Sequence, residues 1–258
     1  MLLANQVFRL PWTGSVEGLA ASITTALSSK SAFYYLAWYA VLSLLFESDR
    51  QIRASATDVG FVLLIAMLNF LSASSVAWVS ITAFGIFIVL RSARDSSLAA
   101  AAVVLMALAL NGLWGPTLFD LFAIQLLQLD AALVGTLLSL TQPGMSWDQT
   151  IVGRPDGHSV FIYSPCSSFH NISLGLLCWV SVTKLVRSRW VRSDFLWASA
   201  VAGAVIVLNA SRLYLMALSP EYFTYWHDGF GVVIVNWVTT LVVLAISLWG
   251  ALGTRRAQ

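Results

Sequence analysis

Three short polar clusters interrupt an otherwise apolar sequence, and each one contains a side chain that can take part in catalysis. The clusters are Ser164-Pro165-Cys166-Ser167-Ser168, Asn209-Ala210-Ser211-Arg212 and His227-Asp228-Gly229-Phe230-Gly231. A thiol is a nucleophile, a guanidinium stabilises developing negative charge, and an imidazole transfers protons. Because polar side chains at membrane depth are costly, clusters of this kind indicate a functional site.

Cys166 follows a Ser-Pro pair that is typical of a helix start. Serine is a preferred N-cap and proline suits the first helical position. The sequence therefore predicts Cys166 in the first turn of a helix, where the positive end of the helix dipole favours the thiolate. Free backbone N–H groups of that turn would also be able to bind an oxyanion. The alternative is a small buried hydrophobe, which is the role we expect for Cys178 further along the same helix.

Asn209 and Arg212 are three residues apart, so they share one face of a predicted helix. Arg212 interrupts a long apolar run and needs a partner, because an unpaired buried charge is strongly unfavourable. Its role is either structural, by snorkelling or by an ion pair with Asp120 or Asp130, or functional. In the functional interpretation it is a fixed cation that binds a substrate carbonyl or stabilises an oxyanion and a thiolate.

His227 opens the last apolar segment, whose positive dipole end would help to keep the imidazole neutral for general-base chemistry. An interfacial structural histidine is the alternative. Gly231, one turn further on, would let another helix approach closely. His170 is a rival base four residues after Cys166, but the two share one helix, so we rank it as a supporting residue. His158 lies in a polar loop and is expected to be solvated.

The composition predicts the scaffold that carries these clusters. Of 258 residues, 59% are hydrophobic and 10% are charged, whereas a soluble domain has about 25% charged residues. The sequence therefore predicts an all-α polytopic transmembrane bundle. The formal net charge of +2 gives no indication of nucleic-acid binding. No cysteine–histidine spacing typical of a metal site is present, and no metal or cofactor is expected.

The apolar runs predict about seven to eight membrane spans. The clearest are residues 32–46, 59–71, 76–90, 98–114, 165–186, 195–218 and 229–252. Residues 118–140 follow an expected break at Gly115-Pro116 and are either a crossing or a helix lying at the interface. We expect a single integral membrane domain over residues 1–258. Residues 1–30 would be a surface arm with an amphipathic helix, and residues 141–163 an extracytoplasmic hairpin or lid before the cysteine helix.

Two basic segments predict the orientation. Residues 184–192 carry four Lys or Arg in nine positions, and Arg255-Arg256 end the last span. By the positive-inside rule, both segments are cytoplasmic. This places Cys166, the far end of the Arg212 helix and His227 at the outer face of a cytoplasmic membrane.

The ordered clusters resemble a known family. Cys166-Ser167, Asn209-x-x-Arg212 and His227-x-x-x-Gly231 on three successive apolar segments are similar to the exosortase/archaeosortase family. The hydrophilic segment before the cysteine is also similar, and the resemblance is strongest over residues 130–231. Many members have Cys-Ser-Gly, whereas Ser168 follows here, which indicates a divergent subgroup.

The resemblance implies a membrane-embedded cysteine protease or transpeptidase. Its substrates would be exported proteins with a C-terminal sorting signal, made of a short motif, a transmembrane helix and a basic tail. Cys166 would be the nucleophile, Arg212 the transition-state stabiliser and His227 the proton-transfer residue. Substrate-binding or supporting roles would fall to Asn209, Ser167, His170 and Gly231. Water, or an amine on an anchor lipid, would resolve the thioester, and the bilayer is the other expected partner.

Two other classes of function fit the same clusters. In a solute transporter or channel, Asn209, Arg212 and His227 would line the path. Loss of the Cys166 thiol would then be tolerated while loss of Arg212 would not. In a non-catalytic membrane scaffold, none of these residues would be needed.

Overall fold

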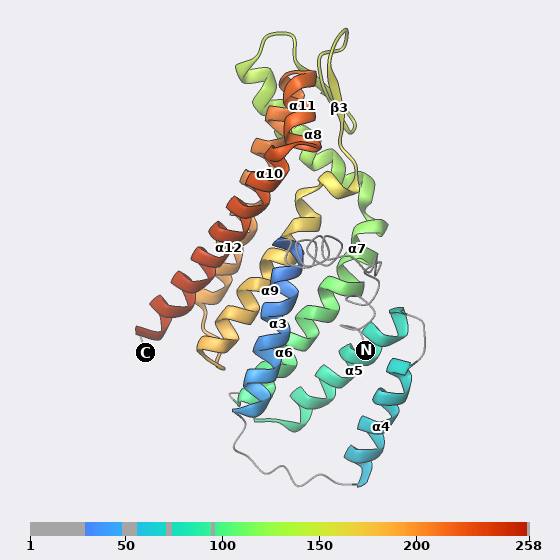
Figure 1. Cartoon of the computed structure of the whole chain (residues 1–258), viewed down its shortest axis with the longest axis vertical. Helices are drawn as coiled ribbons and strands as arrows, with labels where there is room; N and C mark the ends of the chain where they lie inside the picture. Colours follow the sequence, from blue (N-terminus) through green and yellow to red (C-terminus); the bar gives the residue numbers. More distant parts are fainter. Residues whose placement is uncertain (1–28, 48–55, 71–73, 94–95, 257–258) are drawn as a thin grey trace, which may run out of the picture.

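The computed structural model describes residues 29–47, 56–70, 74–93 and 96–256. Of the surface arm expected over residues 1–30, all but the last two residues lie outside this part of the chain. The described residues form a helical bundle with one small sheet (Figure 1). Its helices are α3 (Ser29–Phe46), α4 (Ala56–Phe70), α5 (Ser74–Arg91), α6 (Ser97–Ala109), α7 (Gly115–Leu121), α8 (Ala123–Thr141), α9 (Ser168–Val186), α10 (Ser193–Leu218), α11 (Pro220–His227) and α12 (Phe230–Arg256). The predicted all-α polytopic architecture is confirmed.

The apolar segments divide into two length classes. Among the described residues, five are long enough to cross a membrane: Ser97–Leu121, Ala123–Thr141, Ser168–Val186, Ser193–Leu218 and Phe230–Gly253. Three shorter apolar helices are Ala32–Phe46, Ala56–Leu68 and Ser75–Arg91. Together they agree with the approximate prediction of seven to eight spans.

The break expected at Gly115-Pro116 is wrong. The chain stays helical there because a π-helical turn, η1 (Leu110–Trp114), connects α6 to α7. Pro116 is the second residue of α7, which directly follows this π-helical turn. The change of direction comes later, at Phe122 between α7 and α8, where φ is −117° and ψ is 18°. The apolar run from 118 to 140 is therefore divided between two helices.

Helix α9 occupies the centre of the bundle and packs against α3, α6, α10 and α12. Small residues allow this close packing. A Cβ atom added at Gly175 on α9 would lie 3.2 Å from the side chains of both Val201 and Val205 on α10. The polar residues at the start of α9 are thereby held against α10.

The hydrophilic segment before the cysteine forms a three-stranded antiparallel sheet, one strand more than the hairpin we expected. Strands β1 (Ser146–Asp148), β2 (Ile151–Gly153) and β3 (Ser159–Phe161) pair in the order β1-β2-β3. Buried Val152, Val160 and Ile162 pack in a cluster with side chains of α8 and α10. His158 is not merely solvated, because its Nε2 donates to the carbonyl of Met216 on α10 at 2.9 Å. The sheet is therefore fixed to the bundle, and β3 leads directly to the cysteine.

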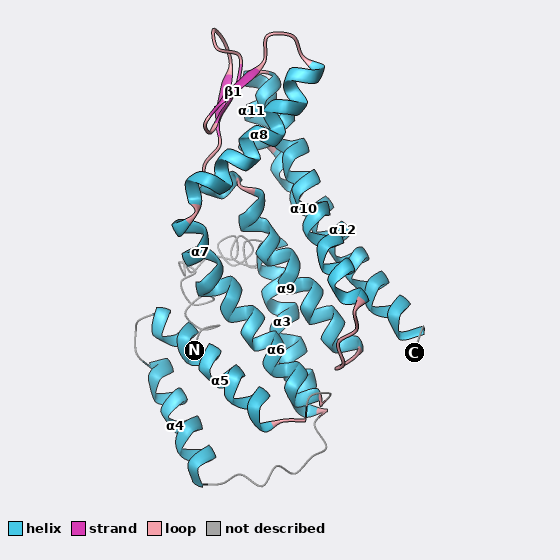
Figure 2. Cartoon of the chain, turned by 180° about the vertical axis from the view of Figure 1, so that it is seen from behind, coloured by secondary structure: helices cyan, strands magenta, loops and turns pink. Residues whose placement is uncertain are grey.

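The sheet, α8 and α11 lie together at one end of the bundle (Figure 2). From that end α9 runs to the basic connection before α10, α10 returns, and α12 leads to the C-terminus (Figure 1). All three polar clusters therefore lie at the end of the bundle opposite the basic connection.

Candidate active site

Cys166 lies in a short 3₁₀ turn, η2 (Ser164–Cys166), and is 97% buried, with 3% of its surface exposed. The predicted position in the first turn of the helix is wrong, because α9 begins two residues later, at Ser168. Ser167 has extended backbone angles and is the N-cap, its hydroxyl accepting from the N–H of Phe169 at 3.3 Å. Cys166 therefore immediately precedes the helix cap.

We had expected free backbone N–H groups around Cys166 that could bind an oxyanion. In the structure these groups are already hydrogen-bonded. The hydrogen bonds are Cys166 N to Tyr163 O (2.8 Å), Ser167 N to Ser164 O (3.1 Å), Ser168 N to Asp130 Oδ2 (3.0 Å) and Phe169 N to Ser167 Oγ (3.3 Å). Charge developing on a substrate near Cys166 must therefore be stabilised by a side chain.

Asp130 on α8 holds the start of the cysteine helix. Its carboxylate has 3% exposure and accepts from Ser167 Oγ at 2.8 Å and from Ser168 N at 3.0 Å. A buried carboxylate is stable there because the helix N-terminus presents positive partial charge. The sequence offered Asp130 as an ion-pair partner for Arg212, but its carboxylate accepts hydrogen bonds from the start of α9.

We expect Asp130→Ala to lower the free energy of unfolding by about 2–4 kcal/mol, because it leaves two buried donors without an acceptor. Thermal unfolding of the purified protein in detergent measures this. Asp156→Ala, which removes an exposed carboxylate from the sheet loop, is the matched control and should change stability by less than about 0.5 kcal/mol. Equal melting temperatures for the two variants would contradict the assignment.

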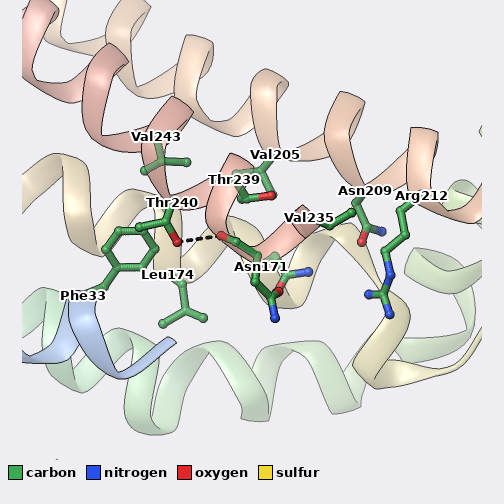
Figure 3. A pocket seen from close by; sticks show the side chains of 12 residues that line it. Phe33, Asn171, Leu174, Val205, Asn209, Arg212, Val235, Thr239, Thr240 and Val243 are labelled. Atoms are coloured by element: carbon green, nitrogen blue, oxygen red, sulfur yellow. Dashed lines mark hydrogen bonds between the residues drawn. The ribbon is translucent and has the colours of Figure 1, made fainter. Parts of the chain in front are cut away.

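Two side chains on one face of helix α10 contact the cysteine segment and the histidine segment of the site. Asn209 Nδ2 donates to the carbonyl of Cys166 at 2.8 Å and to Ser168 Oγ at 3.1 Å. Arg212 Nε donates to the carbonyl of Trp226, the residue before His227, at 3.0 Å. The predicted shared face is seen in Figure 3, where both side chains extend to the same side of α10. One helix thereby sets the relative positions of the cysteine and histidine segments.

Arg212 also lines a small pocket of about 40 Å³ between α9, α10 and α12 (Figure 3). Its polar lining residues are Asn171, Asn209, Arg212, Asn236, Thr239 and Thr240. None of the described residues that line it is acidic, so the guanidinium is the source of charge in the pocket. This environment suits a polarised carbonyl or an oxyanion.

Hydrogen-bond partners at both ring nitrogens fix the orientation of His227. Its Nδ1 lies 2.7 Å from Asp228 Oδ1, and a carboxylate only accepts, so Nδ1 carries the hydrogen. In the neutral ring, Nε2 is then the acceptor, and it lies 3.1 Å from the Tyr163 hydroxyl. The ring also stacks on Phe223, with centroids 4.8 Å apart and an angle of 11°. This tautomer is the one that a general base needs.

The setting of His227 differs from the prediction, because this residue ends a helix that the sequence analysis missed. Helix α11 begins after Ser219, whose hydroxyl accepts from Tyr222 N at 3.3 Å, so the Ser219-Pro220 pair was the available signal. Gly231 permits a close approach as expected, but of α11 itself. A Cβ atom there would lie 2.6 Å from the ring of Trp226.

Tyr163 is the site residue that sequence reasoning did not assign. Its hydroxyl lies 3.1 Å from His227 Nε2, and its carbonyl accepts the Cys166 N–H at 2.8 Å, so the residue contacts both segments. The charge of Cys166, desolvation and a hydrogen-bonding contribution from the Cys166 side chain raise the pKa of Tyr163, with a further contribution from Asp228 and an opposing one from Arg212. Its place directly before Ser-Pro-Cys was the only signal in the sequence.

His170 lies apart from this arrangement. It is exposed and lines another cavity, of about 320 Å³, together with Tyr34 and Asn111. That cavity lies between α9 and the α6–α7 segment, whereas the Arg212 pocket lies between α9, α10 and α12. Tyr163 thus contacts both the Cys166 and the His227 segments, whereas His170 lines a separate cavity, and its supporting role stays a prediction.

A comparison with protein families gives a match over most of the chain. The family model described as Transmembrane exosortase (Exosortase_EpsH) matches residues 24–249, which is most of the chain. The chain belongs to the transmembrane exosortase family. This exosortase is thus a membrane protein of a family involved in processing sorting signals, and the resemblance stated from its motifs is confirmed. No curated protein and no solved structure gave a significant match.

Proposed function

We propose that this exosortase is a cysteine peptidase or transpeptidase that cleaves C-terminal sorting signals of exported proteins. The observation that carries the proposal is the position of Tyr163 against both segments, its carbonyl accepting the Cys166 N–H at 2.8 Å and its hydroxyl lying 3.1 Å from His227 Nε2. Nucleophile and base belong to segments 61 positions apart in sequence, and α10 holds both of them through Asn209 and Arg212. Nucleophilic catalysis requires this kind of juxtaposition.

In the proposed reaction, the Cys166 thiolate attacks the scissile carbonyl and forms a tetrahedral intermediate. Arg212 stabilises the oxyanion through its terminal nitrogens, since its Nε is used by the Trp226 carbonyl. Protonated His227 then supplies the proton for the leaving amine, and the acyl group stays on Cys166 as a thioester. Water or an acceptor amine attacks the thioester, and His227 takes up the proton of this second nucleophile.

The proposed site faces the outer side of the cytoplasmic membrane. This proposal is supported by the opposite ends of the bundle that the polar clusters and the basic connection occupy. Basic connections are retained in the cytoplasm. A substrate translocated up to its own basic tail would then present the segment before its transmembrane helix at the level of Cys166.

The test is to trap the thioester. Full-length enzyme in liposomes is incubated with a co-encoded exported protein that ends in a motif, a transmembrane helix and a basic tail. We expect the N-terminal part of the substrate to become attached to the peptide that contains Cys166, and hydroxylamine to release it. Cleavage without acylation of Cys166, or acylation at another residue, would overturn the proposed chemistry.

A further inference from the structure

Tyr163 occupies the position between the proposed nucleophile and the proposed base. Both ring nitrogens of His227 are engaged, Nδ1 by Asp228 at 2.7 Å and Nε2 by the Tyr163 hydroxyl at 3.1 Å. The same residue accepts the Cys166 N–H through its carbonyl at 2.8 Å, and the Cys166 side chain has the largest effect on the pKa of the Tyr163 hydroxyl. A tyrosine hydroxyl can donate one hydrogen bond and accept another at the same time. It is therefore suited to connect the thiol and the imidazole.

The backbone fixes Tyr163 relative to Cys166. Tyr163 is extended, with φ of −129° and ψ of 172°, and its carbonyl accepts the Cys166 N–H at 2.8 Å. Its side chain is 40% exposed, so the ring is not a core residue whose position follows from packing. On the other side, stacking on Phe223 and the bond to Asp228 fix the His227 ring. These restraints on both neighbours hold Tyr163 between the cysteine and histidine segments.

We propose that Tyr163 is a catalytic residue that relays protons between Cys166 Sγ and His227 Nε2. The inference rests on the proposed function and extends it by one residue. In the activating step, the Cys166 S–H proton passes to the Tyr163 oxygen while the Tyr163 O–H proton passes to Nε2. The products are a thiolate and an imidazolium, and the phenol is regenerated. The same path in reverse returns the proton toward the leaving amine.

The charges around the hydroxyl are compatible with this relay. The groups that face it are Cys166, His227 and Asp228. Cys166 and Asp228 raise the pKa of Tyr163, whereas Arg212 lowers it. Because Cys166 and Asp228 outweigh Arg212, the pKa of Tyr163 is raised. A raised pKa keeps the phenol protonated at neutral pH, so it has a proton to donate to His227 while it accepts one from Cys166.

Alkylation of Cys166 by iodoacetamide tests the relay without any substrate. The rate is followed against pH by mass spectrometry, which distinguishes the Cys166 peptide from the Cys178 peptide. We expect His227→Gln and Tyr163→Phe each to move the midpoint of the alkylation-rate profile to higher pH by about one unit. At neutral pH this is a tenfold loss of thiol reactivity. The double variant should show no additional shift, because either change interrupts the same path. Tyr222→Phe, which alters an exposed tyrosine on α11, is the matched control and should leave the profile unchanged.

Two results would overturn the relay. One is a Tyr163→Phe profile identical to that of the wild type. The other is a full additional shift on adding His227→Gln to Tyr163→Phe, which would mean that His227 acts on the thiol directly. Because trapping of the acyl-enzyme tests the proposed function separately, either result can be recognised even where the cysteine chemistry holds.

A second variant keeps the shape of the side chain. Replacement of Tyr163 by 3,5-difluorotyrosine makes the phenol more acidic with little change in size. A relay predicts that the alkaline limb of the kcat profile moves to lower pH, while a structural role leaves that limb in place. In Tyr163→Phe itself, kcat for sorting-signal cleavage should fall about 10²-fold with little change in KM. An unchanged kcat would again contradict the relay.

Discussion

Replacing Cys166 by alanine is expected to reduce cleavage of a C-terminal sorting signal by about 10⁴-fold or more, because removal of a catalytic nucleophile leaves only binding and electrostatic contributions. Cys178→Ala is the matched control, since Cys178 is fully buried in the middle of α9. Cys178 lies ten positions after the first residue of α9, about 15 Å along the helix, and Cys166 precedes that helix, so the control should cleave within about twofold of the wild type. The measurement is the initial rate of substrate processing by purified enzyme in liposomes.

The same pair of variants distinguishes the alternative functions. If Cys166→Ala retained full cellular function while replacement of Arg212 abolished it, a solute path would be favoured over catalysis. If neither change had an effect, a scaffold would be favoured. Loss of processing in Cys166→Ala together with acylation of Cys166 in the wild type is the combination that the proposed function requires.

Replacing Arg212 by glutamine should lower kcat by about 10²–10³-fold, the usual cost of losing an oxyanion-stabilising group. Glutamine removes the charge from the pocket and the Nε–H that holds the Trp226 carbonyl at 3.0 Å. Arg212→Lys keeps a charge but loses the guanidinium fork, so it should fall between glutamine and the wild type. Steady-state kcat and KM with a sorting-signal substrate measure both effects.

The control for charge is Arg154→Gln, which removes an exposed arginine from the sheet at the same end of the molecule. It should leave kcat unchanged. If Arg212→Gln raised KM and left kcat intact, Arg212 would bind the substrate equally in the ground state and in the transition state. Its proposed role as an oxyanion stabiliser would then be wrong.

The sequence was sufficient for the bundle and for the location of the polar clusters, because both follow from composition and from spacing along one helix. Apolar runs predict spans, and two polar residues three positions apart share a helix face whatever surrounds them. Asn209 and Arg212 show this, since their shared face is a local property. The carbonyl groups that they bind, however, come from segments that local spacing cannot place beside α10.

The errors at the site arise where a distant contact overrides a local signal. Ser164-Pro165 and Ser167 are both reasonable helix starts, and Asp130 on α8 favours the later one by accepting from Ser167 and Ser168. Gly115-Pro116 resembles a break, but a π-helical turn carries the helix through it. Tyr163 has no catalytic pattern of its own, and its role becomes visible only when β3 and α11 bring it between two other groups.

The two contacts of α10 make the alignment of the site depend on the orientation of a single helix. An ion pair between Arg187 and Asp194 holds α10 at its basic end, and Asn209 lies fifteen positions further along, about 23 Å away. Pivoting there, a tilt of one degree displaces Asn209 by about 0.4 Å, close to the roughly 0.5 Å tolerance of a catalytic constellation. A small change in the tilt of α10 would therefore displace the polar residues of the candidate site. Helix tilt is set by packing against neighbouring helices, so the packing of α10 against α9 and α12 is what keeps the polar residues of the site in register.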